Sequence, residues 1–281
     1  MRAVVWGDGA VGMGLSVALT DTCDVVLVGP AGSGRGTWNI RAGGFMEAEA
    51  AVSHTECGGR PEGDFALVAL KAYDVSSAAD AVSRCCDRIV CFTNGMGLEK
   101  EFGAGLWARV EPAVLSLGFL VDDRREVTVS PGEVIVSEGG EAARLFRDIR
   151  LPVREVDNIE TYRWAKWLVN SAINPLGALT GLRNNELRDA ELSGVVDGMV
   201  SELKAIIPDD LRPDATDIAG SMLDMLLSES DNRCSMLQDL QAGKRTEIDY
   251  LTGLAADSPE KAPLAATVTA LVRARERRSS S

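Results

Sequence analysis

Residues 7–12 read GDGAVG, and this stretch decides the fold of the N-terminal half of the chain. It directly follows a strand-like run, AVVW at 3–6, and opens a helix-like run, MGLSVALT at 13–20. In such a unit the first glycine makes the turn, the second admits a pyrophosphate and the third lets the helix pack closely. A plain glycine turn would fit the six letters alone, but their context favours a dinucleotide site. The residues expected to bind the cofactor here are Gly7, Asp8, Gly9, Ala10, Val11 and Gly12.

The rest of the first half alternates short β-type runs with helical segments. The clearest β-type runs are VVLV at 25–28, FALVAL at 65–70, RIVCF at 88–92 and AVLSLGF at 113–119. This alternation is typical of a parallel sheet covered by helices. From about residue 157 the pattern becomes helical almost throughout. We therefore predict an α/β protein with a Rossmann-like dinucleotide-binding domain at 1–156 and an all-helical substrate-binding domain at 157–281.

The composition narrows the class of partner. Among 281 residues, 29 are basic and 42 acidic, which gives a net charge of −13 and argues against nucleic acid or an anionic membrane surface. The chain has no apolar run of membrane-spanning length, and it begins with the strand-like RAVVW rather than a leader pattern. We expect a soluble, cytoplasmic protein with a small-molecule ligand.

Cysteine and histidine limit the chemistry. The six cysteines contain no C-x-x-C pair, which favours reduced thiols. His54 is the single histidine, and its polar surroundings, AVSHTECGGR, predict a surface loop. Serine–histidine catalysis and histidine-rich metal sites are therefore not expected, and no metal is predicted. A proton donor would have to be Lys, Glu, Asp, Tyr or Cys.

The end of the second strand normally indicates the cofactor, because an acid there favours NAD and a nearby arginine favours NADP. Here the strand is followed by Gly29 and Pro30, so the sequence indicates neither. The next basic residues, Arg35 and Arg41, are each better explained as surface arginines, although Ser33 and Arg35 could reach a 2′-phosphate from a loop. The third and fourth strands are followed by Lys71 and Asn94, at the edge where open α/β sheets bind ligands.

A polar face recurs along the predicted helix AKWLVNSAINP at 165–175. Lys166, Asn170 and Asn174 are spaced four residues apart, so they share one face of a helix. The opposite face is apolar and suits a core. One ammonium and two amides suit a substrate cleft better than a solvated surface, because lysine can donate a proton and neutral amides can bind a polar substrate.

A second polar group lies in CSMLQDLQAGKRTEIDYL at 234–251. Ser235 and Asp239 are one helical turn apart, and Glu247 lies beyond Gly243. From the residues alone, Ser235 is explained as readily by helix capping, and Glu247 by an exposed pairing with a neighbouring basic residue.

Together these motifs resemble the ketopantoate reductase (2-dehydropantoate 2-reductase) family. The matching stretches follow the expected order: GDGAVG, LVALKAYDV, TNGMG, KWLVNSAINPLGALTG with RNNEL, and SMLQDLQAGKRTEIDYL. The resemblance implies a Rossmann domain joined to a helical domain like the C-terminal domain of 6-phosphogluconate dehydrogenase, with the active site between them. It implies NADPH-dependent reduction of ketopantoate to pantoate, in pantothenate and coenzyme A biosynthesis.

The resemblance also implies residue roles. Lys166 would be the general acid, and Glu247 would help to position it while contacting the substrate hydroxyl and the cofactor. Asn170 and Asn174 would bind substrate, and Ser235 would bind its carboxylate. The remaining assignments concern the cofactor, which Lys71 and Asn94 would contact, Asn94 also lying near the substrate. A homodimer is compatible with the resemblance, and the sequence leaves the oligomeric state open.

Two departures keep alternatives open. Pro30 stands where the family usually has an arginine for the 2′-phosphate, so NADH stands beside NADPH as a candidate. The segment at 254–263 is shorter than in the family, and Ala265 stands where Asn is common. A related reductase of another short 2-keto acid therefore remains an alternative, as does a non-catalytic dinucleotide-binding sensor.

Overall fold

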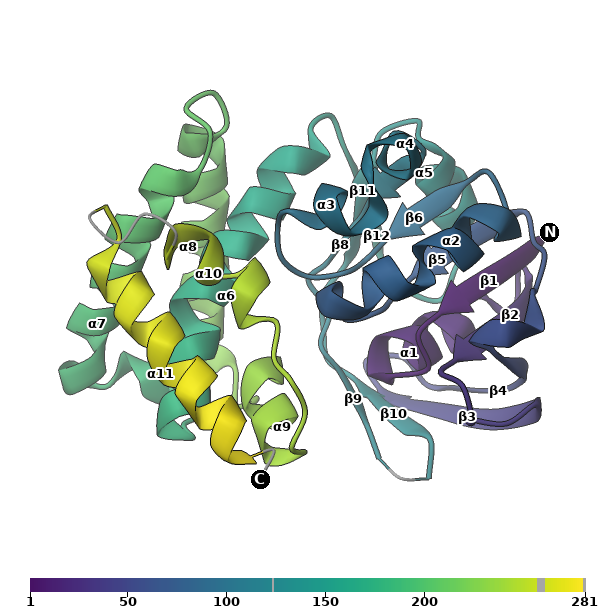
Figure 1. Ribbon diagram of the computed structural model, residues 1–281, viewed down its shortest axis with the longest axis horizontal. Helices are drawn as coiled ribbons and strands as arrows, with labels where there is room; N and C mark the ends of the chain where they lie inside the picture. Colours follow the sequence, from purple (N-terminus) through teal and green to yellow (C-terminus); the bar gives the residue numbers. More distant parts are fainter. Residues whose placement is uncertain (123, 257–260, 280–281) are drawn as a thin grey trace. The chain divides into compact units, whose positions relative to one another are not determined.

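The computed structural model describes residues 1–122, 124–256 and 261–279 (Figure 1). The chain forms two compact units: Met1–Thr93 with Leu98–Ile159, and Asn94–Gly97 with Glu160–Ser281. The α/β prediction is confirmed, with a mostly parallel Rossmann-like sheet in the first unit and helices in the second. The change of unit lies between Ile159 and Glu160, whereas the sequence places it after residue 156. The assignment of 1–156 to cofactor binding and of 157–281 to substrate binding remains a proposal.

Within the described residues, the main sheet of the first unit has nine strands in the order β7-β6-β5-β1-β2-β4-β3-β10-β9. Their bounds are β1 Arg2–Trp6, β2 Asp24–Gly29, β3 Gly36–Gly44, β4 Ala48–Glu56, β5 Phe65–Val68, β6 Ile89–Cys91, β7 Val110–Pro112, β9 Phe119–Val121 and β10 Glu126–Val129. β1 pairs in parallel with β2 and β5. The carboxyl ends of these three strands therefore share one edge.

A smaller sheet in the same unit has the order β12-β11-β8. Its strands are β8 Val114–Leu115, β11 Val134–Ser137 and β12 Val153–Val156. The run AVLSLGF, expected as one strand, is divided between β8 and β9 in different sheets, with Ser116–Gly118 between them. Gly132 fits closely against this break, because a Cβ there would lie 2.6 Å from the Leu117 nitrogen.

Helices cover the sheets of the first unit. They are α1 Ala10–Leu19, α2 Val75–Cys85, α3 Leu98–Phe102, α4 Ala104–Trp107 and α5 Glu141–Phe146, with 3₁₀ turns η1 Cys57–Gly59 and η2 Ala72–Asp74. α1 is almost wholly buried, and its Leu15 and Leu19 join the strand residues Val5 and Leu27 in one apolar core. This packing fixes the N-terminus of α1 at the carboxyl edge of the sheet.

The hairpin of β3 and β4 was not expected, and the prediction that His54 lies on a surface loop is wrong. His54 is in β4 and is only 4% exposed. Its ring stacks on Trp38 of β3, with the ring centroids 3.6 Å apart. Val52 and His54 are the buried positions of an alternating strand, whose exposed polar residues hide it in the sequence.

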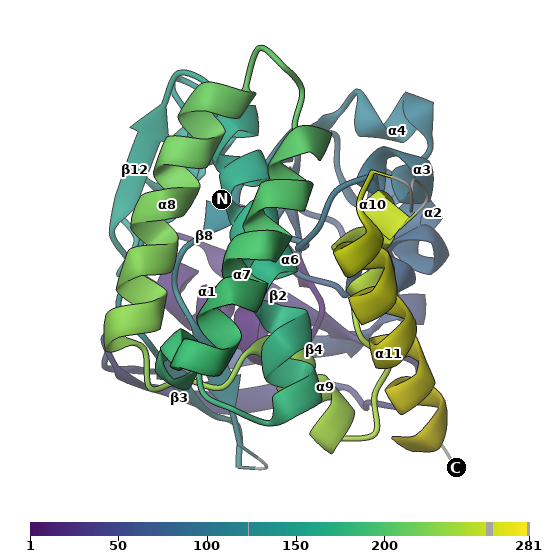
Figure 2. The same ribbon diagram turned by 90° about the vertical axis from the view of Figure 1, so that its left-hand side faces the viewer.

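The second unit is helical (Figure 2). Its elements are α6 Ile159–Thr180, α7 Ala190–Leu203, α8 Arg212–Glu229, α9 Ser235–Gln241, α10 Gly253–Ala256 and α11 Pro263–Ser279, with 3₁₀ turns η3 Asn185–Arg188, η4 Lys204–Ile206 and η5 Ile248–Tyr250. α6 runs through the middle of the unit, and its Trp167, Leu168 and Ala172 are buried in the core. Among the described residues, no helix combines the length and apolarity needed to cross a bilayer.

Two sequence features of this unit have different outcomes. Pro175 lies inside α6 although proline disfavours a helix interior, and the helix continues to Thr180. Of the shortened segment at 254–263, residues 257–260 lie outside the described residues. Ala265 is buried in α11, and its backbone N–H donates to Glu202 Oε2 at 3.0 Å.

Candidate functional site

The loop GDGAVG forms a cradle between β1 and α1. Gly7 has φ +111°, and a Cβ there would lie 2.6 Å from the Ala69 carbonyl oxygen. A Cβ on Gly12 would lie 1.7 Å from the Gly7 carbonyl oxygen, so helix and turn meet with no room for a side chain. A Cβ on Gly9 would meet nothing within 4 Å. The backbone is therefore open at Gly9, the N-cap of α1, where the first amides of the helix suit a pyrophosphate.

Lys71 lies at the same edge of the sheet. It is the N-cap of η2, three residues after the end of β5, and β5 pairs in parallel with β1. The Ala69 N–H donates to the Trp6 carbonyl at 2.8 Å, and this bond holds the two strand ends together. A cationic side chain thus follows the strand next to the glycine loop, as the sequence suggests.

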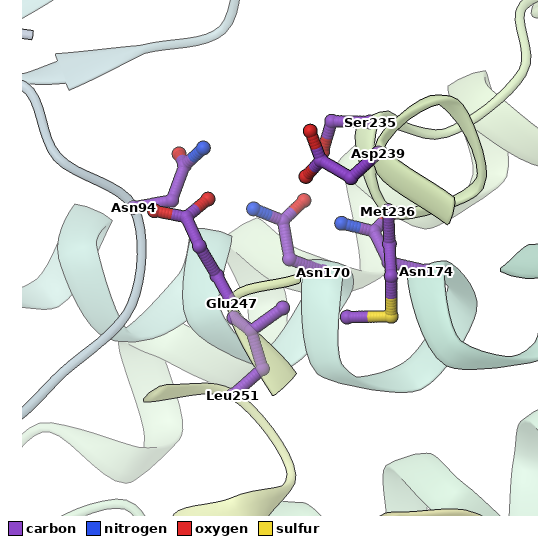
Figure 3. Close-up of a pocket in the computed structure, with 8 residues that line it drawn as sticks. All are labelled: Asn94, Asn170, Asn174, Ser235, Met236, Asp239, Glu247 and Leu251. Atoms are coloured by element: carbon purple, nitrogen blue, oxygen red, sulfur yellow. The ribbon is translucent and has the colours of Figure 1, made fainter. Parts of the chain in front are cut away.

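The second unit contains a small pocket that is partly open to solvent (Figure 3). Its lining residues are Asn94, Asn170, Asn174, Ser235, Met236, Asp239, Glu247 and Leu251. Five of these were predicted from the sequence, and they come from segments far apart in the chain. The two apolar residues were not predicted. Asp239 was noticed one turn after Ser235 but received no role.

α6 supplies the two amides. Asn170 and Asn174 project from the same face of the helix toward the other polar groups (Figure 3). Asn174 is only 6% exposed. The Cys234 thiol donates to its carbonyl oxygen at 3.3 Å, which ties the start of α9 to α6. The periodicity of the sequence is thus realised as a shared face.

α9 supplies Ser235 and Asp239. The N-cap of α9 is Cys234, whose sulfur accepts from the Leu237 N–H at 3.4 Å. Ser235 is therefore not the capping residue, and it lies exposed at one end of the pocket. Asp239 is buried beside it, and their side chains approach each other in Figure 3.

Glu247 and Asn94 lie side by side at the other end of the pocket (Figure 3). Glu247 is 5% exposed, so the alternative of an exposed carboxylate is wrong. The nearby surface pair is Arg245 with Asp249, at 3.0 Å. Asn94 begins the turn Asn94–Gly97, which is fixed because the Met96 N–H donates to the Tyr250 carbonyl at 3.1 Å. Gly95, with φ +91°, has no space for a Cβ against Tyr250.

Lys166 lies on α6 one turn before Asn170 and is half-buried. Burial lowers its pKa to about 8, and the negative charge of Glu247 acts in the opposite direction. A lysine with this pKa is mostly protonated at neutral pH and can still release its proton. With the Glu247 carboxylate near it and Asn170 one turn further along α6, such a group is suited to general acid catalysis.

Comparisons with known proteins decide the family. The family model "Ketopantoate reductase PanE/ApbA" matches residues 3–140, and "Ketopantoate reductase PanE/ApbA C terminal" matches residues 158–276. The 2-dehydropantoate 2-reductase of Archaeoglobus fulgidus is 31% identical over 226 residues, which cover 76% of this chain and 75% of the relative. The chain belongs to the ketopantoate reductase family. It is therefore an oxidoreductase of the 2-dehydropantoate 2-reductase type.

Solved structures agree with the fold of a ketopantoate reductase. A family member from Ralstonia eutropha is 25% identical, with a TM-score of 0.78 and full coverage of both chains. A D-mandelate dehydrogenase solved with NADH and anilino(oxo)acetate has a TM-score of 0.85 at 19% identity, again covering both chains completely. The second likeness shows the fold alone.

Proposed function

We propose that this member of the family reduces the 2-keto group of ketopantoate to the hydroxyl of pantoate, using a reduced nicotinamide cofactor. The observation that carries the proposal is the gathering of Asn94, Asn170, Asn174, Ser235 and Glu247 around one pocket, next to Lys166. The cradle of the first unit fits the pyrophosphate of the cofactor. When bound, the cofactor supplies the hydride.

Lys166 is the proposed general acid. Hydride addition builds negative charge on the carbonyl oxygen, and a positioned ammonium stabilises that charge and then transfers its proton. With a pKa of about 8, Lys166 is in the required form at neutral pH. The negative charge of Glu247 favours the charged form of Lys166. Its removal would therefore lower the pKa of Lys166 further.

The pocket supplies the proposed substrate contacts. The Asn170 and Asn174 amides bind the polar atoms of the keto acid without adding charge, and the Ser235 hydroxyl donates to its carboxylate. Glu247 accepts from the substrate hydroxyl, and Asn94 contacts both substrate and cofactor. Asp239 and Glu247 already place two acidic residues at the pocket, which favours a substrate with one carboxylate over a diacid.

The proposed reaction is tested by initial rates of the purified protein with ketopantoate and with other short 2-keto acids. We expect kcat/KM to be highest for ketopantoate. A higher kcat/KM for another short 2-keto acid would show that ketopantoate is not the preferred substrate, and the proposed mechanism would still apply to that acid. Binding of the cofactor without reduction of any keto acid would instead support the non-catalytic sensor. A role in pantothenate biosynthesis and a homodimer stay predictions.

A further inference from the structure

The end of β2 carries a carboxylate that the local sequence does not reveal. β2 ends at Gly29, and a Cβ on this residue would lie 2.2 Å from Asp8 Oδ2, 2.5 Å from Ser33 Oγ and 2.8 Å from His54 Nε2. Three polar atoms from three segments thus converge on the space that a side chain at position 29 would fill. In dinucleotide folds an acid at this strand end accepts a hydrogen bond from the ribose 2′-hydroxyl. The Asp8 carboxylate, which comes from the glycine loop, lies at this end of β2.

The His54 ring forms one wall of the space that the Asp8 carboxylate occupies. Its Nδ1 lies 2.9 Å from the Gly34 carbonyl oxygen, and since a carbonyl only accepts, Nδ1 is the donor. Nε2 then faces Asp8 Oδ2 at 3.4 Å, and it has no hydrogen-bond partner among the described residues. The imidazole is fully buried and fixed by its stack on Trp38, whereas the Asp8 side chain is 22% exposed. A ligand can therefore reach Asp8, while the fixed His54 ring acts as a positioning residue by limiting the space open to the Asp8 side chain.

The surroundings disfavour a phosphate. Glu56 is the partner of Gly29 across the β2–β4 ladder, and its Oε2 accepts from the Gly32 N–H at 3.2 Å. Two carboxylates, those of Asp8 and Glu56, thus flank the end of β2. Pro30 gives no positive charge, and Arg35 is exposed to solvent. A 2′-phosphate at this place would meet like charges, whereas a 2′-hydroxyl could donate to Asp8.

We propose that Asp8, positioned by His54, selects the unphosphorylated ribose and makes NADH the preferred cofactor of this protein. The inference rests on the cofactor-binding part of the proposed function and not on the identity of the keto acid. It reverses the NADPH preference that the family resemblance implies. It also gives a role to the single histidine of the chain.

The test is a fluorescence titration of the purified protein with NADH and with NADPH, without any keto acid. We expect the Kd of NADH to be at least about tenfold lower, as a hydrogen bond to a charged group allows. Asp8→Asn should weaken NADH binding about tenfold and leave NADPH binding equal or stronger. His54→Gln should move the ratio of the two Kd values in the same direction by less. Glu47→Gln removes an exposed acid of the same unit and should leave the ratio unchanged.

A wild-type protein that binds NADPH as tightly as NADH, or more tightly, overturns the proposal, and this result needs no variant to fold. Equal weakening of both cofactors by Asp8→Asn, in a variant whose circular dichroism matches the wild type, also overturns it. Because the titration contains no keto acid, failure here leaves the proposed reduction untouched. Failure of the reduction with every keto acid likewise leaves the cofactor preference standing.

Discussion

The candidate cofactor site of the first unit and the pocket of the second unit are built from different chemical groups. The cradle at residues 7–12 presents mostly backbone, and its glycines are required by contacts with Ala69 and with each other. The pocket presents side chains from the Asn94 turn, α6, α9 and the segment before η5. A backbone site depends on close approach, whereas a side-chain site depends on charge and proton position. Substitutions in the cradle should therefore change cofactor binding and stability, whereas substitutions in the pocket should change the reaction rate.

The largest effect is expected for Lys166→Met. Loss of the proposed general acid should lower kcat by about 10²–10⁴, with cofactor affinity unchanged. The free energy of unfolding should stay equal or rise, because burial disfavours the charged form of Lys166 in the folded protein. Stopped-flow rates, cofactor titration and urea denaturation check the three parts. If Lys166→Met also lost cofactor affinity by a similar factor, the cofactor site and the pocket would not be functionally distinct.

A matched pair of glycine substitutions tests the cradle. Gly12→Ala places a Cβ against the Gly7 carbonyl and should destabilise the protein by about 1–3 kcal/mol or more. Gly9→Ala meets no protein atom, so it should cost less than about 1 kcal/mol of stability yet weaken the cofactor at least about tenfold. Denaturation midpoints and cofactor titration separate the two. Equal stability losses would show that Gly9 is needed for folding and not for close approach.

Glu247→Gln sharpens the account of the pocket. Without the opposing charge, the pKa of Lys166 should fall further below about 8. In the proposed mechanism reduction needs protonated Lys166, so the loss of rate on raising pH should begin at lower pH than in the wild type. The pH dependence of kcat in both proteins is the measurement. If the midpoint of this pH dependence is unchanged or higher in Glu247→Gln, Glu247 does not control the charge state of Lys166.

The smallest effect is expected for Arg35→Ala. If exposed Arg35 replaced the arginine usual in the family, this change would weaken NADPH far more than NADH. With carboxylates at the end of β2, we expect less than about a twofold change in either Kd, as for most exposed charges. Titration of both cofactors decides, and a loss confined to NADPH would restore the 2′-phosphate interpretation.

The sequence predicts the two regions unequally well. The cradle is contiguous, so one hexamer between a strand and a helix is enough to place it. The shared face of α6 follows from spacing, but burial of Glu247 does not, because Arg245 beside it suggests a surface pair. His54 and Asp8 could not be joined from the sequence, since the β3–β4 hairpin that brings them together has mostly exposed polar positions. Which distant segments pair with one another cannot be read from local periodicity.

The central claim is that Lys166 protonates the substrate in the pocket of the helical unit. Its most direct test is the pH dependence of the single-turnover rate of ketopantoate reduction by the wild-type protein at saturating cofactor. Because burial lowers the pKa of Lys166 to about 8, the rate should be level below that pH and fall above it. In Lys166→Met this step should be absent. A wild-type rate that stays level through pH 8, or the same step in Lys166→Met, would contradict the claim.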